Sequence, residues 1–198
     1  MIHRHLLASF ALAAVATQTP ARATVLASDG HWGTFAVDSF LASDAGLGWI
    51  DDAGNALHFT FVVAGGFVGT LTVLDTGFAG DTFSVLNGAS VLGLTSPVPG
   101  RQYDPSAIAI EDADAAFDDP AFSRATFTFA PGAYSIGGTL AQSLMSGSDR
   151  LDATSGALRL TVGTVAPVPV PEPSSLALLL AGVGVVGTVA RRRRNVRR

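Results

Sequence analysis

The acidic residues between positions 111 and 119 are the strongest candidates for chemistry in this sequence. Five carboxylates fall within nine residues there, at Glu111, Asp112, Asp114, Asp118 and Asp119. Carboxylate oxygens are ligands that Ca²⁺ prefers, and the ion takes about six to eight of them. The spacing differs from that of an EF-hand loop, which needs Gly and Glu at fixed positions. Two interpretations stay open, namely a solvated acidic loop, which the sequence favours, and a calcium site on these five residues.

The histidines and serines offer weaker signals for catalysis. His31 and His58 are the only histidines after residue 23, and they follow neither the H-x-H nor the H-E-x-x-H spacing of metal sites. The sequence contains no G-x-S-x-G turn that would expose a catalytic serine. We therefore expect the protein not to be an enzyme, and to need no cofactor apart from the calcium considered above.

A secreted hydrolase that acts on polysaccharide is the alternative from a different class. Glycosidases use two carboxyl groups at a defined separation, and the acidic residues around Glu111 are candidates for such a pair. Glu111 is the only glutamate between residues 24 and 170, which disfavours a pair of glutamates. Four aromatic residues are candidates for stacking on sugar rings, namely Trp32, Trp49, Tyr103 and Tyr134.

The segments that must position these side chains have the alternating pattern of β-strands. Residues 56–63 place Leu57, Phe59, Phe61 and Val63 on one face. Residues 68–73 follow after Gly65-Gly66, and this spacing suggests a hairpin with residues 56–63. Further alternating segments lie at residues 124–129, 133–136 and 158–162.

The clearest local signal is a second hairpin. Residues 83–86 and 89–92 flank Asn87-Gly88, a dipeptide that suits the positive φ values of a two-residue type I′ turn. Short strands separated by Gly, Pro and Asn predict an all-β fold, specifically an antiparallel β-sandwich with jelly-roll-like connectivity over residues 24–165. Helix is expected only in short pieces, for example near residues 139–145.

Charge is divided unevenly along the chain, which has 198 residues and a formal net charge of −4. Fifteen of the sixteen acidic residues lie between positions 24 and 170, whereas six of the twelve arginines lie in residues 191–198. The chain has no cysteine, which excludes a disulfide scaffold and thiol chemistry. The low net charge is therefore the sum of an acidic body and a basic tail.

Residues 1–23 have the features of a secretory signal peptide. A basic start precedes the apolar run Leu6–Ala16, and Ala21-Arg22-Ala23 gives the small-residue pattern that signal peptidase recognises. We expect cleavage after Ala23 and export of the body.

Residues 166–198 form three parts in order. A Pro-rich spacer (167–173) is followed by an uncharged apolar stretch (174–190) and the Arg tail (191–198). Seventeen residues of helix span about 26 Å, which suffices for a short transmembrane helix when flanking Arg side chains reach the interface. The positive-inside rule places the tail in the cytoplasm. The arginines are therefore interpreted as the flank of a membrane anchor and not as a nucleic-acid site.

This three-part end resembles the PEP-CTERM sorting signal of Gram-negative bacteria, over about residues 169–194. The resemblance implies recognition by an exosortase, with Pro171, Glu172 and Pro173 as the sorting motif and Arg191, Arg192, Arg193 and Arg194 as the retention cluster. It also implies transient anchoring in the inner membrane with the C-terminus in the cytoplasm. Delivery to the cell surface or the exterior, often alongside exopolysaccharide, would follow.

The sequence as a whole predicts an exported, non-enzymatic surface or extracellular-matrix protein. Its expected partners are signal peptidase, an exosortase, exopolysaccharide and, transiently, the inner membrane, with no nucleic acid. Besides the hydrolase, a permanently membrane-anchored periplasmic binding module stays open as an alternative.

Overall fold

Strands make up nearly all of the regular structure of this protein. The computed structural model describes residues 22–42 and 45–164. The elements within these residues are β1 (Arg22–Val25), β2 (Asp29–Asp38), β3 (Leu57–Val63), β4 (Phe67–Thr76), β5 (Thr82–Asn87), β6 (Ser90–Leu94), α1 (Ala113–Asp118), β7 (Arg124–Phe129), β8 (Gly132–Gln142), β9 (Met145–Ser146), β10 (Asp149–Arg150) and β11 (Ala153–Thr164).

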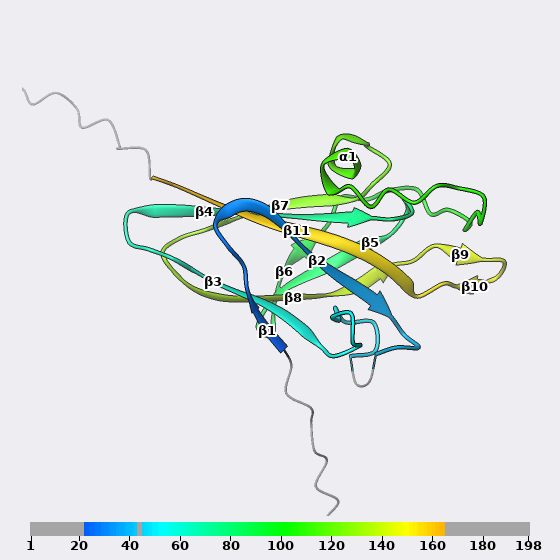
Figure 1. Ribbon diagram of the computed structural model, residues 1–198, viewed down its shortest axis with the longest axis horizontal. Coiled ribbons are helices and arrows are strands. Elements are labelled where there is room, and N and C mark those ends of the chain that lie inside the picture. The colour runs from blue at the N-terminus through cyan, green and yellow to red at the C-terminus, as the bar shows by residue number, and fades with distance from the viewer. Residues whose placement is uncertain (1–21, 43–44, 165–198) are drawn as a thin grey trace, which may run out of the picture. The chain divides into compact units, whose positions relative to one another are not determined.

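The longer strands form two sheets. The order is β1-β3-β8-β5-β6 in the five-stranded sheet and β2-β11-β4-β7 in the four-stranded sheet, with β9 and β10 as a separate pair (Figure 1). All pairings are antiparallel except that of β1 with β3, which is parallel. The predicted all-β class is confirmed, and the jelly-roll-like connectivity stays a prediction.

The core lies between the two sheets, because each contributes its inward-facing apolar side chains to one cluster. The predicted face of β3 is confirmed, since Leu57, Phe59, Phe61 and Val63 are all buried. Across from them, the four-stranded sheet contributes buried leucines and valines from β4 and β11: Leu71, Val73, Leu158 and Leu160. The strands thus alternate because one face of each sheet covers the other.

The predicted hairpin between residues 56–63 and 68–73 is wrong. β3 belongs to the five-stranded sheet and β4 to the four-stranded sheet, so the turn around Gly65-Gly66 carries the chain across the sandwich. Both strands point their apolar residues into the same core from opposite sides. The local sequence of such a crossing turn looks like that of a hairpin, and only long-range pairing separates the two.

The second predicted hairpin is confirmed, but its turn has a different geometry. β5 pairs with β6, and Asn87 and Ser90 are the last opposed residues. The turn is therefore Gly88-Ala89, in which Gly88 has a φ of 57° and Ala89 has no positive φ. A positive φ at the first central position alone fits a type II′ turn rather than type I′.

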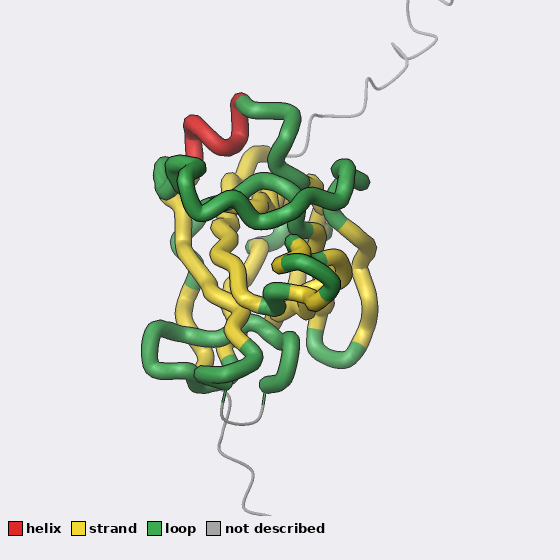
Figure 2. The backbone as a smooth tube through the Cα atoms, turned by 90° about the vertical axis from the view of Figure 1, so that its right-hand side faces the viewer, coloured by secondary structure: helices red, strands yellow, loops and turns green. Residues whose placement is uncertain are grey.

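The helix expected near residues 139–145 is wrong, because residues up to Gln142 complete strand β8. The short helix α1 lies instead inside the acidic run (Figure 2). Ala116 of α1 packs with Leu74 and Phe122 in a second, smaller buried cluster. Leu74 alternates with the core residues of β4, so α1 covers the outer face of the four-stranded sheet.

Candidate functional site

Two aspartates are buried where the chain crosses from the four-stranded to the five-stranded sheet. Asp75 is the second-last residue of β4, and Asp81 immediately precedes β5. Their relative exposures are 0% and 1%. Gly80 lets the chain approach residue 144 closely, since a Cβ at Gly80 would lie 2.8 Å from Leu144 Cδ2. We refer to Asp75 and Asp81 as the aspartate pair.

Hydrogen bonds satisfy only one oxygen of each carboxylate. The backbone N–H of Asp81 donates to Asp75 Oδ2 at 3.3 Å, and the N–H of Leu144 donates to Asp81 Oδ1 at 2.7 Å. Asp75 Oδ1 and Asp81 Oδ2 are buried and have no hydrogen-bond partner. Buried polar atoms normally have one, so the aspartate pair is an exception that requires an explanation.

Burial also makes negative charge unfavourable at the aspartate pair. Burial first, and the neighbouring charge of Asp81 second, raise the pKa of Asp75 to about 9. Burial raises the pKa of Asp81 to about 6. The Thr154 side chain, the Leu144 N–H and the positive charge of Arg150 favour the ionised form and so keep the pKa from rising further. Near neutral pH the two side chains therefore do not both carry a charge unless a counter-ion is present.

Asp81 lies at the floor of a surface hollow of about 370 Å³, which we call the crossover hollow. Its lining is mostly apolar, with Phe78, Leu144 and Leu151 among its residues, and oxygen-bearing side chains lie between them. Thr76 donates its hydroxyl hydrogen to Ser155 Oγ at 3.0 Å, and Thr154 and Glu111 also belong to the lining. The hollow therefore brings together a buried carboxylate, the hydroxyl groups of Thr76, Tyr103, Thr154 and Ser155, and an exposed carboxylate.

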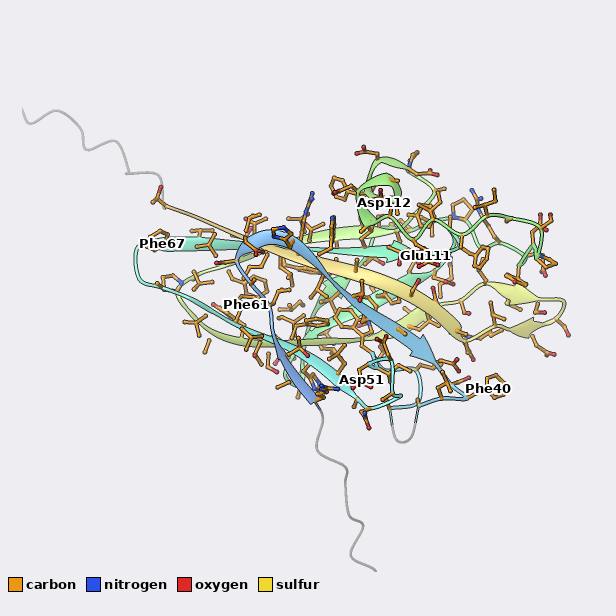
Figure 3. All side chains as sticks on the ribbon, in the orientation of Figure 1. Phe40, Asp51, Phe61, Phe67, Glu111 and Asp112 are labelled. Carbon is orange, nitrogen blue, oxygen red and sulfur yellow. The ribbon has the colours of Figure 1, made fainter. Side chains whose placement is uncertain are left out.

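The acidic run is divided among several separate tasks. Asp112 caps α1, since its Oδ1 accepts from the N–H groups of Asp114 and Ala115 at 2.9 and 3.3 Å. Figure 3 shows Glu111 and Asp112 on the stretch that leads into α1, of which Glu111 alone belongs to the lining of the crossover hollow. Asp119 Oδ1 accepts from the Ala121 N–H at 2.8 Å. Asp112 and Asp119 therefore accept hydrogen bonds from backbone N–H groups close to them in the sequence.

Asp114 joins the acidic run to β2 and β11. Its Oδ1 accepts from Trp32 Nε1 at 2.9 Å and from the Arg159 guanidinium at 3.1 Å. The Arg159 guanidinium lies 4.3 Å from the Trp32 ring centroid, a cation–π contact.

Asp118 is exposed. Across residues 22–42 and 45–164, no group of three or more potential metal-binding side chains is found, and calcium binding by the acidic run stays a prediction.

A second acidic segment, the turn at residues 51–55 with Asp51 and Asp52, has a local structural role. Asp51 Oδ1 accepts from the N–H groups of Ala53 and Asn55 at 3.0 and 2.9 Å. These bonds, with that of Asn55 the strongest, hold the pKa of Asp51 below its ordinary value. Asp51 also pairs with Arg22 at 3.2 Å, which connects the turn to β1.

The four candidate aromatic residues have different surroundings. Trp49 is 2% exposed and stacks on Phe35 with 3.9 Å between ring centroids, so its suggested role in sugar stacking is wrong. Tyr134 donates its hydroxyl hydrogen to the Ala130 carbonyl at 2.8 Å. Tyr103 lines the crossover hollow, and Trp32 lies under Arg159. The structure therefore leaves Tyr103 and Trp32 as candidates.

The two histidines lie in different sheets. His31 is on β2, where its Nδ1 lies 3.0 Å from Asp29 Oδ2. His58 is on β3 and faces away from the core, close to Gly137 of β8. They therefore do not share a site.

Several predicted residues lie outside the described part of the chain. These are Ala21, the sorting tripeptide Pro171-Glu172-Pro173 and the cluster Arg191–Arg194. Ala23 lies in β1, opposite His58 of β3. Residues 22–42 and 45–164 contain no helix with the length and apolar character needed to cross a membrane. The transmembrane helix predicted at residues 174–190 lies beyond them.

The aspartate pair was missed by the sequence predictions, although a signal for it exists. Leu71 and Val73 face the core from β4, and Asp75 continues their alternation. An aspartate in a series of inward-facing positions indicates a buried carboxylate.

Comparison with known proteins identifies the C-terminal segment. The PEP-CTERM protein-sorting motif matches residues 169–194. The chain therefore carries this motif, which supports exosortase-dependent sorting to the cell surface. No curated protein matches the chain. Among solved structures, the pre-peptidase C-terminal domain of collagenase from Bacillus anthracis is similar at 12% identity and a TM-score of 0.37, covering 73% of this chain and 100% of that chain.

Proposed function

We propose that this protein is an exported, non-enzymatic surface or extracellular-matrix protein whose β-sandwich body is released by an exosortase. The observation that carries the proposal is the sorting motif at residues 169–194. A signal-peptide pattern at residues 1–23 supports export, because it supplies the entry signal that the sorting motif requires. On this proposal the precursor is held briefly in the inner membrane before the body is delivered.

The proposed role of the delivered body is to bind, in association with exopolysaccharide. Tyr103 supports such a role, because an aromatic ring with an exposed face can stack on a sugar. Tyr103 is 36% exposed and packs edge-on against Phe78 at 5.2 Å between centroids, which fixes the orientation of its ring.

The decisive experiment is an intact-mass measurement on the protein in its own host, after fractionation into membrane and extracellular material. We expect an extracellular species that has lost the Arg tail. Pro171→Ala and Pro173→Ala are expected to trap the precursor in the membrane. Pro167→Ala, in the same spacer but outside residues 169–194, is the matched control and should be processed normally. A wild-type protein that stays in the membrane and retains Arg198 would contradict the proposal and support the anchored binding module.

A polysaccharide hydrolase is the second candidate, because Asp81 and Glu111 line the same hollow. Burial raises the pKa of Asp81 to about 6, which suits a carboxylic acid that donates a proton. The test is an assay of the released body on exopolysaccharide from the host. Turnover that disappears in Glu111→Gln but persists in Asp118→Asn would support this candidate, and absence of turnover would support the binding role.

A further inference from the structure

The unpaired oxygens of the aspartate pair indicate a missing counter-charge. Asp75 Oδ1 and Asp81 Oδ2 are buried without hydrogen bonds. Such an oxygen has lost its hydration with nothing to replace it, which is unfavourable. Folded proteins normally resolve this by binding a cation or a proton at the site. We propose that Asp75 and Asp81 together bind one Ca²⁺ ion that enters through the crossover hollow, whose lining includes Asp81 but not Asp75.

The neighbouring charged side chains do not replace such an ion. Arg150 attracts Asp81, but its Nε already donates to Asp152 Oδ1 at 2.7 Å. Asp152 repels Asp81 and so opposes the effect of Arg150. The two surrounding charges are therefore engaged with each other, and a divalent ion from solution supplies the charge that two ionised carboxylates require.

The donor atoms around the pair select a hard cation. The hydroxyl groups of Thr76, Thr154 and Ser155 line the hollow with Asp81, so the available side-chain donors are oxygens. Zinc and copper sites normally include nitrogen or sulfur ligands, whereas the chain has no cysteine and neither His31 nor His58 is in this lining.

Calcium fits the crossover hollow better than magnesium does. Calcium accepts irregular arrangements of about six to eight oxygens, whereas magnesium requires near-octahedral geometry. Two carboxylates supply only part of a calcium shell. The hollow, at about 370 Å³, has room for the waters that complete it. A site with few charged ligands belongs in the weaker class of calcium sites, with a Kd of about 10⁻⁴ to 10⁻³ M.

The ion would stabilise the crossover between the sheets. Asp75 belongs to β4 and Asp81 leads into β5, while the Leu144 N–H bond attaches the segment after β8 to the same carboxylate. One ion therefore connects the end of one sheet to the start of a strand in the other. Its loss should be detected as lower stability of the sandwich rather than as lost contact with another molecule.

The test is calcium titration of the full-length chain, purified in detergent and stripped with EGTA. Isothermal calorimetry is expected to give one Ca²⁺ per chain, bound at least tenfold more tightly than Mg²⁺. The thermal midpoint is expected to rise by about 5 to 10 °C at a calcium concentration a hundred times the Kd. A calcium concentration of 10 mM is roughly ten times the weakest Kd of this class. If the wild type binds no calcium up to that concentration, the proposal is overturned. Equal or tighter binding of magnesium would overturn the assignment to calcium.

Isosteric variants locate the ion. Asp75→Asn and Asp81→Asn are expected to weaken calcium binding at least tenfold, because each removes one ligand charge. Asp118→Asn is the matched control, since it makes the same change at an exposed carboxylate of the acidic run, and it should bind as the wild type does. Loss of binding in Asp118→Asn with retention in Asp75→Asn would place the ion on the acidic run and overturn the proposal. Near-ultraviolet circular dichroism confirms that each variant is folded, and the wild-type titration is decisive by itself.

Discussion

The aspartate pair and the acidic run differ in how their carboxylates are used. The run has five carboxylates in nine residues, but Asp112 and Asp119 accept from local backbone. Asp114 accepts from the half-buried side chains of Trp32 and Arg159. The pair has two carboxylates, both buried and each with an unpaired oxygen. An acidic segment of sequence is therefore compatible with well-satisfied side chains. A bound ligand is therefore expected to change the free energy of unfolding most at the aspartate pair, where buried oxygens have no hydrogen-bond partner.

The largest effect is expected from removing the Asp81 carboxylate. Asp81→Ala in saturating calcium should lower the free energy of unfolding by about 2–4 kcal/mol, because the Leu144 N–H loses its acceptor and a cavity remains. Urea denaturation measures this change. The equivalent change in the acidic run, Asp118→Ala, should stay within about 0.5 kcal/mol. Equal losses in the two variants would remove the distinction between the regions.

Acidity should stabilise the calcium-free protein through the aspartate pair. The pKa of Asp75 is about 9 in the folded protein, against an ordinary value of 3.8. Between these values the unfolded chain is ionised while the folded chain keeps the proton, so raising the pH favours unfolding. In EGTA, stability should fall between pH 6.5 and 7.5 by up to about 1.4 kcal/mol through this group.

Asp75→Asn should reduce that pH dependence, because the amide does not titrate. Urea midpoints at the two pH values measure it, with Asp118→Asn as the control that keeps the wild-type slope. A slope that is the same in Asp75→Asn and wild type would show that other groups cause it.

Loss of the helix cap should have a smaller effect. Asp112→Ala removes the acceptor for the N–H groups of Asp114 and Ala115 and should cost about 1 kcal/mol in unfolding free energy. Asp112→Asn keeps a capping oxygen and should cost only a few tenths of a kcal/mol. Calcium affinity should be unchanged in both variants. A tenfold loss of affinity in Asp112→Asn would instead assign the ion to the acidic run.

The smallest effect is expected for the ion pair between the exposed Asp114 and the half-buried Arg159. The Asp114 side chain is 73% exposed, so a double-mutant cycle with Asp114→Asn and Arg159→Gln should give a coupling below about 1 kcal/mol. The coupling should fall further at 0.5 M salt, where exposed charges are screened. A larger coupling that does not change with salt would mean that the acidic run also contains an ion pair that is shielded from solvent.

The sequence was sufficient for the all-β class, but not for the helix, which it expected near residues 139–145 and which lies at Ala113–Asp118, nor for the long-range arrangement of the strands. Alternation identified the core face of β3, because the period of a half-buried strand is local. It did not distinguish a hairpin from a crossing turn after Val63, since β4 pairs with β11 and β7 rather than with β3. The β5–β6 turn was predicted one residue too early, because Asn87 pairs with Ser90 and the central residues are Gly88 and Ala89.

The site was harder to predict for a related reason. Trp49 was placed among the surface candidates, but it packs against Phe35 of β2, a contact that no local pattern contains. Asp75 was overlooked because a single aspartate near Gly77 also fits an ordinary turn. Its burial depends on β11, which pairs with the end of β4 at Gly156.

The position of β11 limits when the sandwich can form during export. This last strand pairs with both β2 and β4, so the four-stranded sheet has no centre until residues 153–164 have crossed the membrane. The sorting motif begins at residue 169, only a few residues after the strand ends. Completion of the sheet and arrival of the motif at the membrane therefore fall at almost the same moment of translocation. On the proposed route, an exosortase would thus meet a chain whose folding has only just become possible.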